Sequence, residues 1–347
     1  MAKTKNKRLK VFLYIITVLA VIAIVIGYFI RTTVFKPLEL TETVFIYIES
    51  STKYDEVAAQ IKEKVDLPSD KVFELIAERM KYPQSIKSGR YAIKDGMTMP
   101  KIIRMLRSGN QTAVKLTFNN MRTKENLAGR ISNQLMVDSL ALLTALKDEK
   151  KVEELGFDTN TVVAMFIPNT YEVYWDTSVD KLLTRMQKEY NTFWNESRKA
   201  KAKQIGLTPL EVSTLASIVE EEATYSDEYS TVAGLYLNRL KRGQRLEADP
   251  TVKFAVGDFS LRRILYKHLE VESPYNTYRN DGLPPGPIRV PSIKGIDATL
   301  SPQDHKYLFM VAKDDLSGRH NFSTTHAEHL RNARKYQRAL NERRIYK

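Results

Sequence analysis

Residues 208–223 have the sequence TPLEVSTLASIVEEEA, which opens with a strong helix-start signal. Thr208 can cap the helix, Pro209 fits the first helical position, and Glu211 completes a capping box. The following residues continue the helix into a run of three glutamates. The sequence therefore predicts a helix that carries three adjacent carboxylates near its end.

Helical geometry places these glutamates on different faces, because residues three, four and seven positions apart share a face. Glu222 is expected to lie over an apolar stripe, which consists of Leu215, Ile218 and Val219. Glu221 is expected to point away from this stripe, and Glu220 to lie at its edge. One of the three carboxylates is therefore directed toward the buried side.

A carboxylate on an apolar face is costly unless it is neutral or partnered. Loss of water disfavours the ionised form and raises the pKa, which suits a general acid that protonates a glycosidic oxygen. Glu222 is therefore a candidate general acid. The alternative is a structural carboxylate that is satisfied by backbone amides or by an arginine such as Arg239.

The residues after this helix favour a carbohydrate site. A second amphipathic helix is expected to begin near Ser226 and to end near Arg242. Two loops follow, at residues 245–252 and 275–288, and both are rich in polar, glycine and proline residues. Tyrosine rings can stack on sugars and amides can hydrogen-bond them. The alternative is a pair of ordered surface loops.

Residues 38–110 predict a small module of strand, two helices and strand, followed by a further helix. The expected elements lie at residues 44–48, 54–61, 69–80, 88–93 and 99–107. This order resembles a LysM-like α/β module, and LysM modules bind glycans that contain N-acetylglucosamine. The alternative is a structural spacer.

Residues 113–204 predict an intermediate α+β region. It should begin with a strand at 114–118 and continue with helices near 124–135 and 138–146. A single long helix is expected from 179 to 201, with an apolar stripe that packs in the core. Residues 205–347 then form the catalytic region, so the fold class expected outside the membrane is α+β with a helical catalytic core.

An apolar run at residues 11–30 predicts a transmembrane anchor. Twenty helical residues rise about 30 Å, which is enough to cross a bilayer. The alternative, a cleaved signal peptide, has a shorter apolar region and a small-residue cleavage site. Five basic residues precede the run, so residues 1–10 are expected to be a cytoplasmic tail, with everything after the single span outside.

The composition narrows the possible chemistry. The 347-residue chain has a net charge of +13 but no basic stripe interleaved with aromatics, so nucleic-acid binding is not expected. It has no cysteine, which excludes thiol catalysis, disulfides and thiolate metal sites. His320, His326 and His329 are close in sequence, but a structural His320 is expected rather than a metal site. We expect no metal and no cofactor.

Several separated blocks together resemble the YceG-like family of endolytic murein transglycosylases. The blocks are 215–220 (LASIVE), Glu222, 238–240 (NRL), 249–252 (DPTV), 275–278 (YNTY), 282–288 (GLPPGPI), 307–311 (YLFMV) and 320–322 (HNF). The resemblance implies that Glu222, the second glutamate of a Glu-x-Glu pair, is the catalytic residue. Helical spacing selected the same residue.

The resemblance also implies supporting and binding residues. Those expected to support Glu222 are Glu220, Asn238, Asp249 and Thr251. Those expected to bind substrate are Tyr275, Asn276 and Tyr278. Ala223 and Glu247 depart from residues that are common in the family. The implied partners are peptidoglycan glycan strands and, as a candidate, a peptidoglycan synthase at the inner membrane.

In such an enzyme one glutamate protonates the bond between N-acetylmuramic acid and N-acetylglucosamine and then deprotonates the muramic C6 hydroxyl. A 1,6-anhydro ring forms and no water is consumed. Two rival functions stay open at this point. A muramidase would need a second carboxylate, for which Asp249 is the best candidate. A wall-binding scaffold would use the LysM-like module and would not need Glu222.

Overall fold

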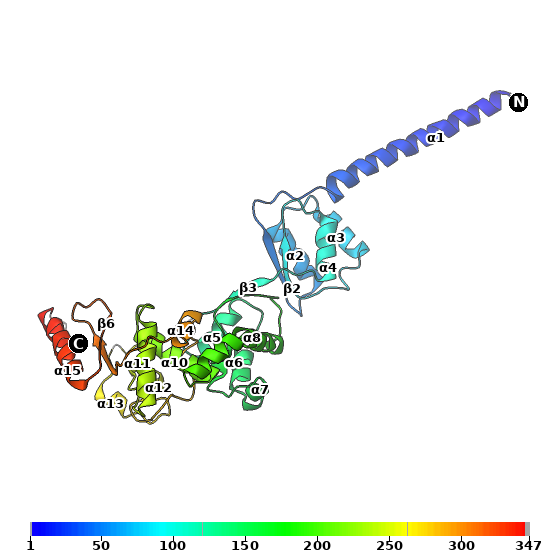
Figure 1. Ribbon diagram of the computed structural model, residues 1–347. Coiled ribbons are helices and arrows are strands. Elements are labelled where there is room, and N and C mark those ends of the chain that lie inside the picture. The colour runs from blue at the N-terminus through cyan, green and yellow to red at the C-terminus, as the bar shows by residue number, and fades with distance from the viewer. Residues whose placement is uncertain (1, 120, 262, 344–347) are drawn as a thin grey trace. The chain divides into compact units, whose positions relative to one another are not determined.

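The computed structural model describes residues 2–119, 121–261 and 263–343 (Figure 1). Helices and short paired strands make up a mixed α+β fold, as predicted. The chain divides into two compact units. Unit 1 contains Met1–Lys115 and Glu172–Thr177, and unit 2 contains Leu116–Tyr171 and Ser178–Lys347.

The apolar N-terminal helix is present and longer than predicted. Helix α1 covers Ala2–Phe29 and continues into the π-helical turn η1, Ile30–Val34. In the described part of the chain, Leu9–Val34 is the one helical stretch long and apolar enough to cross a membrane, and none of it is buried. Of the basic cluster before it, the side chains of Lys3, Lys5 and Arg8 lie outside the described residues.

Unit 1 has the predicted order of strand, helix, helix and strand. Strands β1 (Val44–Ile48) and β2 (Gly89–Ile93) pair antiparallel, with Ile46 opposite Tyr91. Between them lie α2 (Tyr54–Lys64) and α3 (Asp70–Arg79), and α4 (Met99–Ser108) follows. Proline in the first turn starts α4, and Gly109 ends it in the left-handed conformation that favours glycine.

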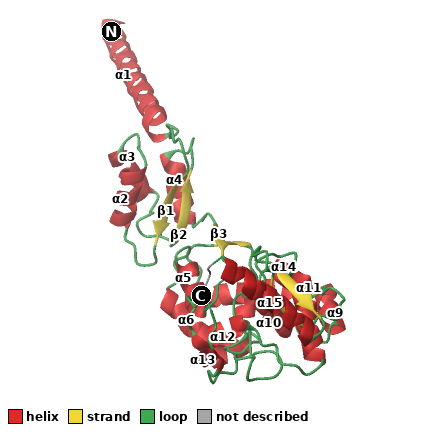
Figure 2. Cartoon of the chain, turned by 90° about the vertical axis from the view of Figure 1, so that its left-hand side faces the viewer, coloured by secondary structure: helices red, strands yellow, loops and turns green. Residues whose placement is uncertain are grey.

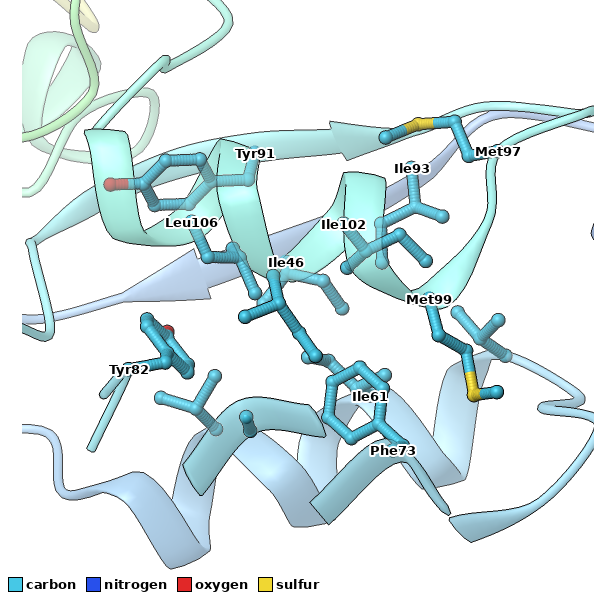
Figure 3. Close-up of a cluster of buried hydrophobic side chains, with 14 of the residues drawn as sticks. Ile46, Ile61, Phe73, Tyr82, Tyr91, Ile93, Met97, Met99, Ile102 and Leu106 are labelled. Atoms are coloured by element: carbon cyan, nitrogen blue, oxygen red, sulfur yellow. The ribbon is translucent and has the colours of Figure 1, made fainter. Parts of the chain in front are cut away.

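One apolar core holds unit 1 together (Figure 3). Ile46 of β1, Ile61 of α2, Phe73 of α3 and Ile102 of α4 point toward one another and are fully buried. Each element contributes one face, as expected from alternating residues in strands and 3.6-residue periodicity in helices. This agreement explains why the local pattern identified the elements.

The first half of unit 2 is mainly helical. After β3 (Val114–Thr117) come α5 (Lys124–Ser132), α6 (Ser139–Lys147), α7 (Glu149–Glu154) and the 3-10 turn η2 (Val162–Met165). Strand β4 (Thr170–Val173) pairs with β3. The predicted single helix at 179–201 is wrong, because the chain forms α8 (Val179–Phe193) and α9 (Glu196–Gln204). Asn195 caps α9 by accepting a hydrogen bond from the Arg198 amide at 3.0 Å, and this cap interrupts the helix.

The second half of unit 2 contains the predicted glutamate helix. Helices α10 (Pro209–Glu222), α11 (Tyr229–Lys241) and α14 (Ile293–Thr299) pack against one another (Figures 1 and 2). Strands β5 (Phe309–Ala312) and β6 (His320–Ser323) form an antiparallel hairpin. The C-terminal helix α15 (His326–Glu342) packs on this hairpin.

The predicted loop at 245–252 is helical in its second half. Helix α12 covers Asp249–Val256 and is followed by the short α13, Tyr266–Leu269. Pro250 stands in the first turn of α12, where its missing amide costs no hydrogen bond, and Gly257 ends the helix with a φ of 77°. The Asp-Pro pair is therefore a helix start rather than part of a loop.

Candidate functional site

Helix α10 begins as predicted but is buried on almost every face. The capping box is formed: the Thr208 amide donates to Glu211 at 2.7 Å, and the Glu211 amide donates to Thr208 at 3.2 Å. The hydroxyl groups of three buried residues donate to backbone carbonyls of the same helix; these residues are Ser213, Thr214 and Ser217. The expectation that only the side of α10 carrying Glu222 is buried is therefore wrong, because neighbouring elements surround the helix.

Glu220, which was expected at the edge of the apolar stripe, is instead the most buried of the three glutamates. Its side chain is 2% exposed and accepts hydrogen bonds from the amide, at 2.9 Å, and the hydroxyl of Ser292. Arg289 lies 3.5 Å from its other oxygen. A Cβ atom on Gly295 would stand 2.1 Å from Glu220, so α14 can approach only with glycine there. In the described residues no hydrogen bond joins Glu220 to Glu222, and Glu220 instead holds the start of α14.

Glu221 forms a charged cluster instead of pointing into solvent. Its carboxylate lies 2.8 Å from both Arg122 and Arg289, and its side chain is 12% exposed. The expected outward position is wrong because Arg122 and Arg289 come from distant parts of unit 2 and cover this face. Two of the three carboxylates are therefore neutralised by arginine.

Glu222 differs from its neighbours because its hydrogen-bond partner is a neutral hydroxyl. Tyr236 of α11 donates to it at 2.8 Å. Burial raises the pKa of Glu222 to about 7; the Tyr236 hydrogen bond opposes this shift, and the negative charge of Asp249 adds to it. Glu222 is also the last residue of α10, where the partial negative charge of a helix end disfavours a carboxylate. Its carboxyl can therefore both donate and accept a proton near neutral pH.

Glu222 opens into a polar cavity of about 270 Å³ in unit 2. The other lining residues are Leu235, Tyr236, Arg239, Leu246, Glu247, Asp249, Tyr278, Met310, Val311, Ala312 and His320. Of the residues predicted to support catalysis or bind substrate, Asp249 and Tyr278 line the cavity with Glu222. They are joined by a hydrogen bond from the Tyr278 hydroxyl to Asp249 at 2.7 Å. The cavity therefore has carboxyl, phenol and imidazole groups available to a polar substrate.

Two predicted supporting residues lie outside this cavity lining and hold nearby backbone. Asn238 donates from its side chain to the carbonyls of His305, at 2.8 Å, and Tyr307, at 3.2 Å. Thr251 is fully buried and shares a 2.8 Å hydrogen bond with Thr277. These contacts join the chain before β5 to α11, and the 275–278 segment to α12.

The two remaining predicted binding residues also shape loops. Asn276 is buried and donates to the carbonyls of Leu269 and Val271, both at 2.9 Å. Tyr275 packs against Phe254 with ring centroids 4.7 Å apart, and its partial burial raises its pKa to about 12. Their substrate-binding roles stay predictions, since the described contacts of both are with the protein itself.

Tyr236 is a cavity residue that sequence reasoning did not single out: it lies in the second amphipathic helix, and its hydroxyl reaches Glu222. Arg239, the arginine that the sequence offers as an alternative partner for Glu222, makes its described hydrogen bonds to other groups. Arg239 donates to the carbonyls of Leu308, at 2.7 Å, and Leu246, at 2.9 Å, and it lies 3.1 Å from the Glu247 carboxylate. Glu247 has a φ of 48°, a strained conformation for a residue with a side chain. The packing of α11 against α10 and the hairpin creates these contacts.

Comparisons with known proteins agree with this architecture. The model of the YceG-like family matches residues 46–335. An endolytic murein transglycosylase of Bacillus subtilis is 31% identical over 317 residues, which are 87% of each chain. One from Streptococcus pneumoniae is 24% identical and is matched over 83% of this chain and 57% of its own length. A crystal structure of a YceG-like protein from Listeria monocytogenes has a TM-score of 0.55 and 26% identity, covering 84% of this chain and 99% of that one. The family match covers most of the sequence, including the whole cavity, and this chain therefore belongs to the YceG-like family.

Proposed function

We propose that this protein is an endolytic murein transglycosylase, which cleaves glycan strands of peptidoglycan at internal bonds. Its relatives in Bacillus subtilis and Streptococcus pneumoniae carry this name. The observation that carries the proposal is the position of Glu222 in a polar cavity, with a pKa of about 7 and a tyrosine rather than an arginine as its partner. No cofactor is required by this chemistry.

The proposed reaction uses the Glu222 carboxyl twice. In its protonated form it donates to the oxygen between N-acetylmuramic acid and N-acetylglucosamine as that bond breaks. The resulting carboxylate then takes the proton from the muramic C6 hydroxyl, whose oxygen closes onto C1 to form a 1,6-anhydro end. Glu222 regains its proton, so the cycle balances without water. Tyr236 orients the carboxyl through its 2.8 Å hydrogen bond.

A muramidase is the second candidate function, because Asp249 lines the same cavity as Glu222. A second carboxylate could activate water or form a glycosyl intermediate, as in ordinary glycosidases. Asp249 lies in the first turn of α12 and accepts a hydrogen bond from the Tyr278 hydroxyl at 2.7 Å, which fixes its carboxyl group at the cavity. The two reactions differ in their products.

Product analysis separates these functions. Purified protein is incubated with glycan strands freed of stem peptides, and the fragments are analysed by mass spectrometry. We expect 1,6-anhydro-muramic ends, which are 18 mass units lighter than hydrolysed ends because no water is added. Reducing ends would support a muramidase and overturn the proposed reaction. Fragments only from strand termini would contradict internal cleavage.

We also propose that α1 anchors the protein in the cell (inner) membrane, with its N-terminus in the cytoplasm and both units outside. The apolar stretch Leu9–Val34 and the basic residues before it support this orientation. Anchoring would keep Glu222 near newly made glycan strands, so that cleavage terminates the nascent strand, and a peptidoglycan synthase is a candidate partner. A reporter that is active only after export should be active when fused after Lys347. Activity of a reporter that works only in the cytoplasm would contradict this topology.

We further propose that unit 1 contains a LysM-like module that binds glycan. A cavity of about 680 Å³ lies between α2 and α3, lined by residues that include Tyr54, Ala59 and Glu74. Replacing exposed Ala59 with arginine should fill this cavity and weaken binding to insoluble murein without unfolding the module. Glu56→Gln is the charge control, because it also raises the net charge by one and lies on the same helix outside the lining. Equal binding by wild type and Ala59→Arg would favour a spacer.

A further inference from the structure

His320 and Glu228 form a buried pair beside the proposed catalytic residue. His320 is the first residue of β6, and Glu228 immediately precedes α11. Glu228 accepts two hydrogen bonds from His320, one from its backbone amide and one at Nδ1, both at 3.0 Å. The two side chains are only 10% and 14% exposed. Glu228 therefore holds both the backbone and the ring of His320, each through one hydrogen bond.

The hydrogen bond between Glu228 and the His320 ring determines which ring nitrogen carries the proton. An ionised carboxylate can only accept hydrogen bonds, so Nδ1 is the donor toward Glu228. In the neutral ring, Nε2 then carries a lone pair and acts as an acceptor. The described part of the chain offers Nε2 no hydrogen bond, although His320 lines the cavity that contains Glu222. The ring thus has an unused acceptor at the proposed site.

Arg319, the residue directly before β6, makes further contacts at the end of the β5–β6 hairpin that carries His320. Arg319 lies 2.9 Å from Asp227, and its guanidinium stands 4.6 Å from the centre of the Tyr225 ring. Both Asp227 and Tyr225 belong to the short loop that directly follows Glu222. The start of β6 is therefore attached to that loop through adjacent residues, which keeps His320 at a fixed place relative to Glu222.

We propose that His320 is a further substrate-contacting residue, whose Nε2 accepts a hydrogen bond from a hydroxyl or amide N–H group of the glycan, and that Glu228 is its positioning residue. This inference rests on the proposed function, since it takes a glycan as the ligand of the cavity. On this proposal, His320 and Glu228 recognise the sugar before the glycosidic bond breaks. This role is separate from the proton transfers made by Glu222.

Two substitutions of His320 distinguish the function of Nδ1 from that of Nε2. In His320→Asn, the side-chain amide can still donate to Glu228 in place of Nδ1, but nothing replaces Nε2. In His320→Gln, the longer amide can offer an oxygen near the place of Nε2, but the Glu228 contact is lost. His268→Asn is the control, because His268 caps the short α13 and does not line the cavity.

The measurements are thermal unfolding and the steady-state cleavage of glycan strands freed of stem peptides. For His320→Asn we expect wild-type unfolding, an unchanged kcat and a KM raised by about three- to tenfold, the range for one lost hydrogen bond. We expect His320→Gln to keep a lower KM than His320→Asn while unfolding at a lower temperature. His268→Asn should retain the wild-type KM.

Two results would overturn this inference. One is a wild-type KM in His320→Asn, and the other is a loss of kcat together with thermal stability, which would indicate a purely structural pair. If wild-type protein fails to cleave, the proposed function fails separately. Equilibrium binding of the same strands to wild type and His320→Asn then decides the role of His320, because the contact predicts weaker binding whether or not cleavage follows.

Discussion

In unit 1 the described buried side chains are apolar apart from the hydroxyls of Tyr82 and Tyr91, whereas the buried serine, threonine, asparagine and glutamate residues that the structure describes belong to unit 2. Around Phe73, four elements each contribute an apolar face. Around α10, buried hydroxyls and carboxylates are satisfied one by one through hydrogen bonds and arginines. Apolar burial supplies most folding free energy, while buried polar groups are costly unless paired. The core of unit 1 is therefore built for stability, whereas the surroundings of α10 include costly buried polar groups that form the candidate site.

The largest expected effect comes from removing the carboxyl group of Glu222, the one member of the three adjacent glutamates without an arginine salt bridge in the described structure. Glu222→Gln should lower glycan cleavage by at least about 10²–10⁴-fold, the usual value of general acid–base assistance, because both proton transfers lose it. Release of 1,6-anhydro ends by the purified variant measures this loss. Glu196→Gln, whose side chain is 93% exposed in the same unit, should cleave like wild type. Substantial turnover by Glu222→Gln would remove Glu222 from the mechanism.

The core of unit 1 should show the largest effect on stability. Phe73→Ala removes a fully buried ring and should cost about 3–5 kcal/mol. Hydrogen exchange in β1, β2 and α4 should accelerate, while α10 and α11 of unit 2 stay protected. Leu75→Ala on the same helix removes a side chain that is 63% exposed and should change little. Equal loss of protection in both units would mean that the two cores unfold together.

The next largest effect on stability should come from the cluster of Arg289, Glu220 and Glu221 in unit 2. Arg289→Met leaves Glu220 and Glu221 with fewer partners at a buried position and should cost about 3 kcal/mol, because uncompensated buried charge is expensive. Denaturant unfolding measures this change. Arg185→Met, which removes an exposed pair with Glu189, should cost less than about 0.5 kcal/mol. Similar losses in both variants would contradict the special role of the buried cluster.

The smallest effect concerns pH and the stability of unit 2. The pKa of Glu222 is raised from 4.5 to about 7 in the folded state, so the unfolded state binds fewer protons between these values and stability falls as pH rises through them. Glu222→Gln removes this penalty. The variant should be more stable than wild type at pH 8 by on the order of 2 kcal/mol, given about 1.4 kcal/mol per pKa unit and partial exposure to water.

This stability difference should disappear below pH 4.5, where the carboxyl is protonated in both states. Thermal unfolding of both proteins between pH 4 and pH 8 tests the sign. A variant that is less stable than wild type at pH 8 would show that the charge of Glu222 is compensated by a group not identified above.

The amino-acid sequence by itself determined the local elements whose signals lie within a few residues. The capping box of Thr208 and Glu211, the two strand segments of unit 1 and the glycine end of α4 all follow from short-range chemistry, whereas the pairing of those strands does not. The long apolar run likewise predicted the N-terminal helix. The choice of Glu222 came from helical spacing together with the family motif, and spacing alone did not suffice, because it assumed a helix with a solvent-facing side.

Only the tertiary structure decided what surrounds each glutamate. Arg122 and Arg289 reach Glu221 from 99 and 68 residues away, Ser292 reaches Glu220 from 72, and Tyr236 reaches Glu222 from the neighbouring helix. Periodicity reports which residues share a helix face, but it carries no information about which distant segment packs on that face. Those distant segments set the pKa of a carboxyl group, because they exclude water from it and place charged groups near it. Three adjacent glutamates of identical chemistry therefore become an anchor for α14, a partner for arginines and a candidate acid.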